Sequence, residues 1–232
     1  MKERTNLLLF STIFLLPLLV ILASPSFSSM ALGLDRESAR PAAVSTAYFY
    51  SSGLYDGWVL ESGEFTGVGG SMNFSSTEIA LGDDKLNRQY RGILSFNTKT
   101  LGSHTGTIVG AALYVTGNGV VGLNPFTWGK NSLRADIIPG AYGGNATLQV
   151  SDFQAPGGLA NAGIRTGCAV TGKCGISLSA ASLPYLNSKG LTQFRLRFML
   201  DDNNNHAADY YRIFSGNSVL QNRPVLAVQF YP

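Results

Sequence analysis

Alternation of apolar and polar residues within short segments is the feature that most limits how this chain can fold. It is clearest in TQFRLRFML (192–200), in which every second side chain is large and apolar. The apolar positions are Phe194, Leu196, Phe198 and Leu200, and the polar positions between them are Gln193, Arg195 and Arg197. Residues that alternate along a strand point to opposite faces of a sheet. The segment therefore predicts a strand with one face in the core.

Segments of this kind recur along the chain, with turns rich in glycine and asparagine between them. The 27 glycines fit such turns, because glycine adopts backbone conformations that tight turns require. Helical signals are few: only 179–186 fits a helical turn, and Pro184 limits its extent. We therefore predict an all-β fold, an antiparallel jelly-roll β-sandwich.

The N-terminus has the three parts of a secretory signal peptide. MKERTN carries net positive charge, Leu7–Ala23 is largely apolar, and the small residues that follow permit cleavage after Ser28 or Ala31. The alternative is an uncleaved membrane anchor, for which the apolar stretch is short and contains Pro17. We expect cleavage and export to the extracellular space or the cell surface, with no membrane span in the mature chain.

Three regions follow from this interpretation. Residues 1–31 are the signal peptide and 32–48 a linker. Residues 49–232 are one domain, since β-sandwiches of this length are commonly single units. Charged residues make up only 13% of the chain, and the formal net charge is +3. Because a nucleic-acid surface needs a strongly basic patch, we expect no nucleic-acid partner.

Cys168 and Cys174 are the two cysteines of the chain. In an exported protein they are expected to form a disulfide that closes a small loop. The alternative, half of a metal site, needs further soft ligands, and the chain has only two histidines. The composition therefore favours the disulfide.

Catalytic motifs are missing from the sequence. It has no G-x-S-x-G segment, and His104 and His206 both lie in turn-like sequence without a neighbouring set of ligands. A glycosidase needs two carboxylates that face each other across a cleft, and sequence alone does not pair the acidic residues. We predict that the protein is not an enzyme.

The segment LDDNNNHAAD contains an unbroken run of Asp and Asn from 201 to 205. Oxygen ligands at alternate positions resemble the start of a calcium loop, so the candidate calcium ligands are Asp201, Asn203, Asn205 and Asp209. The EF-hand pattern then fails, because His206 stands where that loop needs glycine. The alternative is a polar turn, since Asp and Asn favour tight turns between strands.

Aromatic side chains beside polar ones favour a carbohydrate site, because sugar rings stack on aromatic faces while hydroxyl groups bond to carboxylates and amides. Trp128 lies in a loop rich in Gly, Pro and Asn, and we expect it to be an exposed platform. The candidate polysaccharide-binding residues are Trp128, Tyr210, Asp56, Glu61, Arg195 and Arg197. The two arginines suit an acidic polysaccharide, and the alternative for them is an ordinary solvated strand face. For Trp58 the alternative to a binding role is a core position.

The segment LNRQYRGILSFNTKTLGSHTGTIVGAALYVTG (86–117) resembles a known family. Its charged lead-in, arginine, ILSF strand, turn and TIVGAALYV strand are similar to the DNRLRE-type domain. That family is extracellular, resembles carbohydrate-binding modules and is of the alginate-lyase-associated type. The resemblance covers Tyr55–Pro232 and implies an exported jelly-roll β-sandwich without catalysis of its own. Arg91 matches the family's strand arginine, and its implied role is structural, in a buried pair with a carboxylate such as Asp83 or Asp84.

Two functions remain open at this point. The first is a secreted, non-catalytic protein that binds extracellular or cell-wall polysaccharide through strand-connecting loops, with calcium as an assisting ion. The second is a structural subunit of a cell-surface coat or filament, which self-associates by pairing of strand edges. A clustered aromatic patch on the surface would favour the first function.

Overall fold

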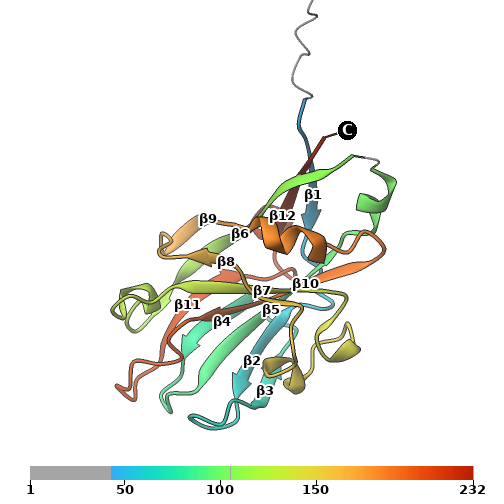
Figure 1. Cartoon of the computed structure of the whole chain (residues 1–232). Coiled ribbons are helices and arrows are strands. Elements are labelled where there is room, and N and C mark those ends of the chain that lie inside the picture. The colour runs from blue at the N-terminus through green and yellow to red at the C-terminus, as the bar shows by residue number, and fades with distance from the viewer. Residues whose placement is uncertain (1–42, 105, 232) are drawn as a thin grey trace, which may run out of the picture. The chain divides into compact units, whose positions relative to one another are not determined.

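The structure is a computed structural model that describes residues 43–104 and 106–231 (Figure 1). The predicted signal peptide and most of the predicted linker lie outside these residues. The described strands are β1 (Ser45–Tyr50), β2 (Gly57–Glu61), β3 (Gly69–Asn73), β4 (Glu78–Asp83), β5 (Gln89–Asn97), β6 (Ile108–Val121), β7 (Leu133–Pro139), β8 (Leu159–Arg165), β9 (Thr171–Ser177), β10 (Leu191–Phe198), β11 (Asp209–Phe214) and β12 (Val225–Phe230). Because β1 begins at Ser45, the segment predicted as a linker (32–48) reaches into the first strand.

Short 3-10 helices occupy several of the connections between strands. They are η1 (Lys99–Ser103), η2 (Pro125–Thr127), η3 (Tyr142–Gly144), η4 (Val150–Phe153), η5 (Ala180–Tyr185) and η6 (Leu220–Asn222). The helical turn expected near 179–186 is η5, which contains Pro184. No helix in the described part of the chain is long and apolar enough to cross a membrane.

All the strand pairs are antiparallel, and the strands follow one another in the order β1-β12-β6-β11-β4-β5-β10-β7-β8. Two long strands hold the layers together: β6 also pairs with β9, and β5 also pairs with β2, which in turn pairs with β3. A single bridge between Gly163 and Leu178 brings β8 to the end of β9, so the sheet curls back on itself. The predicted all-β, antiparallel jelly-roll β-sandwich is confirmed.

The core lies between the layers and is filled by alternate residues of the strands. In β10, Phe194, Leu196 and Phe198 are fully buried, as the alternation predicts. Leu200 is 39% exposed, because the strand ends at Phe198 and the chain turns away before it. The period-two pattern therefore locates the core face but not the end of the strand.

The polar face of β10 is also covered, which the alternation does not predict. The segment 140–155, with η3 and η4, lies over this face and forms a second apolar cluster of Val59, Ile93, Tyr142, Leu148, Phe153 and Ala155. Gln193 holds the segment in place, because its side chain accepts a hydrogen bond from the Tyr142 amide (2.8 Å) and donates one to the Ala146 carbonyl (3.2 Å). The expected solvated strand face is therefore an interior one.

Cys168 and Cys174 form a disulfide, as predicted. The bond joins β9 to the turn that precedes it and closes a short loop, with six positions separating the two cysteines. Loop-closure entropy for so short a loop corresponds to about 2 kcal/mol. We therefore expect the Cys168→Ala/Cys174→Ala variant to lose about 2 kcal/mol of unfolding free energy in urea denaturation. Reduction of the wild-type protein should give the same loss, and an unchanged midpoint after reduction would contradict the prediction.

Candidate functional site

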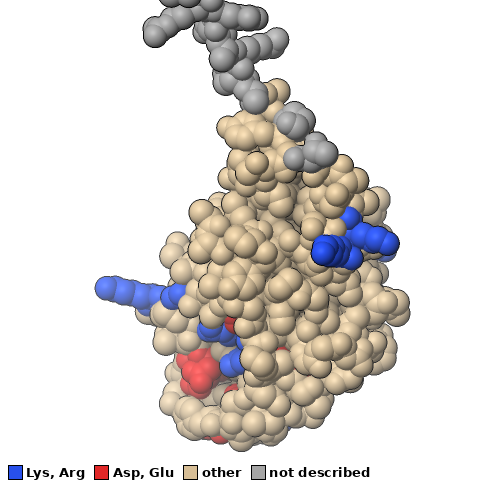
Figure 2. Space-filling model, turned by 45° about the vertical axis from the view of Figure 1, so that its right-hand side comes forward, with Lys and Arg blue, Asp and Glu red and all other residues tan. Residues whose placement is uncertain are grey.

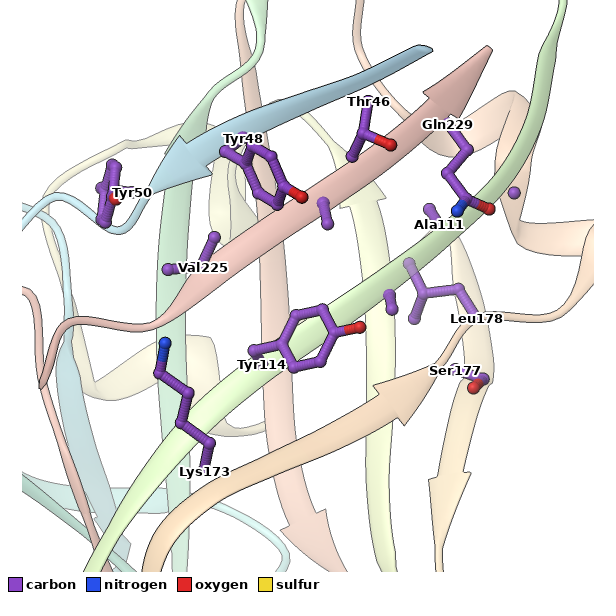
Figure 3. Close-up of a pocket in the computed structure, with 13 residues that line it drawn as sticks. Thr46, Tyr48, Tyr50, Ala111, Tyr114, Lys173, Ser177, Leu178, Val225 and Gln229 are labelled. Atoms are coloured by element: carbon purple, nitrogen blue, oxygen red, sulfur yellow. The ribbon is translucent and has the colours of Figure 1, made fainter. Parts of the chain in front are cut away.

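A hollow of about 660 Å³ lies on the outer face of β1, β12, β6 and β9 (Figure 3). Tyr48 and Tyr50 project from β1, and Tyr114 projects from β6 on the other side of β12. We call this surface the tyrosine face. Its three tyrosines come from segments far apart in the sequence, and only the pairing of the strands brings them together.

The register of the four strands arranges the tyrosine face in rows. Reading across β1, β12, β6 and β9, the rows are Tyr50–Val225–Tyr114–Gly175, Tyr48–Ala227–Ala112–Ser177, and, over the first three strands, Thr46–Gln229–Gly110. Neighbouring strands lie about 4.8 Å apart, and alternate residues of one strand about 7 Å apart. Small residues therefore form the floor of the hollow, with tyrosine rings on both sides of it.

Two glycines leave room for side chains to lie along the sheet. A Cβ atom at Gly175 would be 3.0 Å from Cε1 of Tyr114, and a Cβ atom at Gly110 would be 2.9 Å from Oε1 of Gln229. The Tyr114 ring and the Gln229 amide thus extend over neighbouring strands that carry no side chain. A flat aromatic ring and an amide are in this way presented to the hollow.

The tyrosines are unusually exposed for a protein that buries other aromatic residues fully. Tyr48 is 64% exposed, Tyr50 48% and Tyr114 40%, whereas Tyr142 and Tyr211 are fully buried. Alternation in β1 explains the difference, since Phe49 between the two exposed tyrosines packs into the core. Contiguous exposed apolar patches mark interaction sites in proteins, which makes the tyrosine face the candidate site.

Neutral polar groups accompany the rings. The hydroxyl groups of Thr46 and Ser177 and the amide of Gln229 line the hollow, and Lys173 is its one charged lining residue. No carboxylate lines the hollow as described. Charged side chains are also few on the side of the molecule shown in Figure 2. The tyrosine face therefore offers ring stacking and neutral hydrogen bonds and does not attract ligands mainly by charge.

The expected exposed position of Trp128 is wrong. This residue is only 7% exposed, and its ring lies 6.3 Å from that of Phe198 in β10. The cause is Asn131, whose amide donates to the Pro125 carbonyl (3.0 Å) and whose oxygen accepts from the Leu200 amide (2.9 Å). These bonds hold the loop against the sandwich.

Tyr210, also predicted to bind sugar, lies half-buried in a different hollow of about 200 Å³. It stands edge-on to Tyr90 with ring centroids 5.6 Å apart, and Tyr90 in turn stands edge-on to Trp58 at 5.2 Å. Trp58 packs partly against the core, as its alternative interpretation had it. A sugar-binding role of Tyr210 stays a prediction, on a smaller surface than the tyrosine face.

Asp56 and Glu61 are interior residues and offer no surface for a ligand. Asp56 is fully buried and accepts hydrogen bonds from the Ser51 hydroxyl, the Ser95 amide (2.8 Å) and the Gly216 amide (3.0 Å). Burial raises the pKa of Asp56 to about 7. Glu61 is 4% exposed, and its carboxylate accepts from two backbone amides in the β2–β3 turn and β5. Both carboxylates therefore bind backbone amides inside the folded protein.

Arg195 is buried and Arg197 is partly buried, and an interior carboxylate holds both guanidinium groups. Both contact the buried Asp136, at 3.4 Å from Arg195 and 3.2 Å from Arg197. Arg195 is 8% exposed and also donates to three backbone carbonyls of the segment 152–155. The prediction of an outward arginine ladder is corrected, because the segment 140–155 covers this face.

Arg91 does not pair with Asp83 or Asp84, so this implied pair is wrong. Its guanidinium donates to the Gln89 side chain (2.7 Å) and the Phe153 carbonyl (2.6 Å), and it lies 3.8 Å from the centre of the Phe153 ring. Asp84 instead pairs with Arg88 at 2.5 Å. A structural role of Arg91 stays a prediction, with an aromatic ring and a carbonyl in place of the expected carboxylate.

The run 201–205 forms a loop between β10 and β11 that folds over Asp209. The side-chain amides of Asn203 and Asn205 donate to Asp209 at 2.6 and 2.7 Å. Asp201 is exposed and makes no such contact. In the described residues, no group of three or more His, Cys, Asp or Glu side chains is placed to hold a metal ion. The predicted ligand set is therefore not assembled as a calcium loop would be.

Sequence reasoning missed the tyrosine face, although one signal was present. In STAYFY (45–50), Thr46, Tyr48 and Tyr50 alternate with apolar residues, which indicates an aromatic outer face on a strand. Tyr114 lies in a mostly apolar segment, and the sequence around it does not indicate an exposed position. Its place beside Tyr50 depends on the pairing of β12 with both β1 and β6, which no local pattern encodes.

Comparisons with known proteins add little to this geometry. No known protein family matches the chain, and no curated protein sequence is significantly similar to it, so the DNRLRE-type resemblance is not supported. Among solved structures, a xylan-binding module CBM15 is similar over 81% of this chain and 97% of its own, at 10% identity and a TM-score of 0.36. A Xylanase10C mutant from Cellvibrio japonicus in complex with xylopentaose is similar over 76% of this chain and 28% of its own, at 9% identity and a TM-score of 0.34. Likenesses this faint assign no function, which has to come from the site.

Proposed function

We propose that the protein is a secreted, non-catalytic polysaccharide-binding protein, and that the tyrosine face is its binding site. The observation that carries this proposal is the group of three exposed tyrosines around a floor of small residues. The signal-like N-terminus and the disulfide support export, because disulfides persist in oxidising compartments.

A glycan chain is the ligand that fits this chemistry best. Pyranose rings have apolar C–H faces that stack on aromatic rings, and their hydroxyl groups bond to amide and hydroxyl side chains. The hollow is open and lies along a sheet, which suits a segment of a polymer better than an enclosed small molecule. With Lys173 as the one charged lining residue, the preferred glycan is neutral or weakly charged.

A structural subunit remains the second candidate because of β1. Over Ser45–Tyr50 this strand pairs only with β12 among the described strands, so its other edge has no strand partner there, and only the next residue, Ser51, bridges to Phe96 of β5. Open edges pair readily with strands of other chains. If the protein is such a subunit, it should form polymers that grow with protein concentration, and it should not bind glycans.

Tyr48→Ala and Tyr114→Ala are expected to weaken glycan binding by about tenfold each, because a stacked aromatic pair contributes about 1–1.5 kcal/mol. Binding would be measured by affinity electrophoresis and calorimetry on neutral and uronic-acid polysaccharides. Phe65→Ala is the matched control, since Phe65 is 71% exposed in the β2–β3 turn, away from the tyrosine face. Equal binding by all variants, or none by the wild type, would refute the proposed function, and concentration-dependent polymers would then favour the structural subunit.

A further inference from the structure

The hollow of about 200 Å³ that Tyr210 lines is formed by residues of β2, β5, β4 and β11, together with one residue that precedes β4. We call it the β4 hollow. None of its lining residues lines the tyrosine face. It is therefore a separate surface, with a lining of different chemistry.

Three partly buried aromatic rings contribute the apolar part of this lining. Trp58 of β2 stands edge-on to Tyr90 of β5, and Tyr90 stands edge-on to Tyr210 of β11. In the strand register, Gly82 of β4 lies between Tyr90 and Tyr210 and opposite both. Because glycine has no side chain, it leaves room for the two rings to meet over β4.

An ion pair contributes the charged part of the lining. Oε2 of Glu78 lies 3.3 Å from a guanidinium nitrogen of Arg212, and its other oxygen accepts from the side-chain amide of Asn118 in β6. Both charged side chains are about one-third exposed. Ala80, opposite Arg212 in the register, keeps the space between the pair and the rings free of a large side chain.

The ion pair keeps hydrogen-bonding capacity for a ligand. A carboxylate has about four acceptor positions and a guanidinium about five donor hydrogens. Asn118 and Arg212 use one acceptor position of Glu78 each, and Glu78 uses one donor of Arg212. The β4 hollow therefore offers acceptors and donors side by side.

This combination selects a neutral ligand that carries hydroxyl groups. An anion would meet the carboxylate of Glu78, and a cation would meet the guanidinium of Arg212. A hydroxyl group both donates and accepts, so it bonds to either member of the pair. Sugar rings add an apolar C–H face that suits the aromatic part of the lining. The hollow is smaller than the about 300–1,000 Å³ of pockets for drug-sized ligands, so it has space for one ring.

We propose that the β4 hollow binds a single neutral sugar residue. Glu78 and Arg212 bind its hydroxyl groups, and the rings of Trp58 and Tyr210 contact its apolar part. The residue is a free sugar or one unit of a glycan chain, which present the same chemistry to the hollow. The proposal does not rest on the proposed function, because the two surfaces share no lining residue.

The two tryptophans of the chain provide the test, by NMR titration of the wild-type protein with methyl glycosides of neutral hexoses and pentoses. Trp58 lines the β4 hollow, whereas Trp128 is only 7% exposed and does not line it. We expect one of the glycosides to shift the indole N–H signal of Trp58 saturably, with a dissociation constant of about 10⁻³ M. The signal of Trp128 should stay in place.

Glu78→Gln should weaken this binding by about tenfold or more, because it replaces a charged acceptor. Tyr210→Ala should weaken it by about tenfold through loss of ring contact. Asp201→Asn is the matched control for Glu78→Gln, since Asp201 is an exposed acid that does not line the hollow. We expect this control to change the dissociation constant less than about twofold.

Absence of a saturable Trp58 shift with every glycoside, at concentrations well above the expected dissociation constant, would overturn the proposal. Equal shifts of both tryptophans, or equal weakening by Glu78→Gln and Asp201→Asn, would also overturn it. Should Glu78→Gln fail to fold, Tyr210→Ala must lose the shift in its place. The Trp58 signal reports on the β4 hollow, so failure here leaves the tyrosine face standing.

Affinity electrophoresis on neutral polysaccharides separates the two sources of the sugar, once the Trp58 shift has established the site. Weaker retention of Glu78→Gln than of wild type assigns the hollow to one unit of a glycan chain. Unchanged retention, with loss of the glycoside shift, assigns it to a free sugar. Both results support a sugar site in the β4 hollow.

Discussion

Replacing Asp136 by alanine is expected to destabilise the protein by about 3–5 kcal/mol, because it removes the buried carboxylate shared by the buried Arg195 and the partly buried Arg197. Asp136 is 1% exposed and contacts both Arg195 and Arg197. It also accepts from the Asn161 backbone amide at 2.9 Å, which fixes the start of β8. Without it, Arg195 and Arg197 would lose the carboxylate with which both form ion pairs.

Nearby Arg91 shows how sensitive this region is to charge. Burial is the main cause that lowers its pKa to about 10, and the neighbouring Arg195 and Arg197 lower it further. Arg91 and Arg195 therefore lie beneath the segment 140–155, and the charge of Arg197 acts on Arg91 from nearby. Loss of Asp136 increases their mutual repulsion, so the segment that covers them is expected to loosen first.

Urea denaturation at neutral pH measures this effect. Glu78→Ala is the matched control, because it also removes the acid of an arginine pair, but Glu78 and its partner Arg212 are about one-third exposed. We expect that variant to lose under about 1 kcal/mol. A loss below about 1 kcal/mol for Asp136→Ala as well would show that the buried pair contributes no more than the exposed one.

The fold class was readable from the sequence because it depends on local pattern. Alternation in 192–200 identifies a strand and its core face, and the two cysteines in an exported chain identify a disulfide. Each of these conclusions needs only residues that are neighbours in sequence. The predictions of the fold class and of the disulfide therefore do not require knowledge of how the strands pair.

The polar face of β10 was misinterpreted because its covering comes from elsewhere in the chain. Arg195 looks like a solvated residue until the segment 140–155 is placed over it, and Arg197 until its pairing with Asp136 is known. Trp128 shows the same limit, since a loop of Gly, Pro and Asn looked exposed and Asn131 binds it to the sandwich. Composition predicts where a loop is in sequence but not what it packs against.

The arrangement of the tyrosine face depends on strand register even more strongly. Tyr48 and Tyr114 are 66 positions apart in the sequence, and two strand pairings must be known before they share a face. The candidate residues chosen for their chemistry, Asp56 and Glu61, proved to be interior anchors of turns. The polar residues next to aromatic ones thus have structural roles, while the exposed tyrosines lie on the edge strand β1 and on the central strand β6.

The second large effect is expected at Asp56, which joins three parts of the fold. Its carboxylate binds Ser51 after β1, Ser95 in β5 and Gly216 in the β11–β12 connection. Replacement by alanine leaves three buried donors without an acceptor, and each such donor costs about 1–3 kcal/mol. We expect Asp56→Ala to lose about 3–5 kcal/mol in urea denaturation, and Ser51→Ala, the matched control that removes one donor, to lose about 1 kcal/mol.

The loss at Asp56 should depend on pH in a definite direction. Its pKa is about 7 in the folded protein, against an ordinary value of 3.8, because burial penalises the charged form. Between these values the folded state holds a proton that the unfolded state has released, so this group's contribution to stability is complete below pH 4 and falls as pH rises towards 7. The alanine variant lacks this contribution, and the difference between wild type and Asp56→Ala is therefore larger at pH 5 than at pH 8. Urea denaturation of both proteins at pH 5 and pH 8 tests this prediction. If the stability difference between wild type and Asp56→Ala instead grows with pH, Asp56 is stabilised as an anion by its three donors and Arg223.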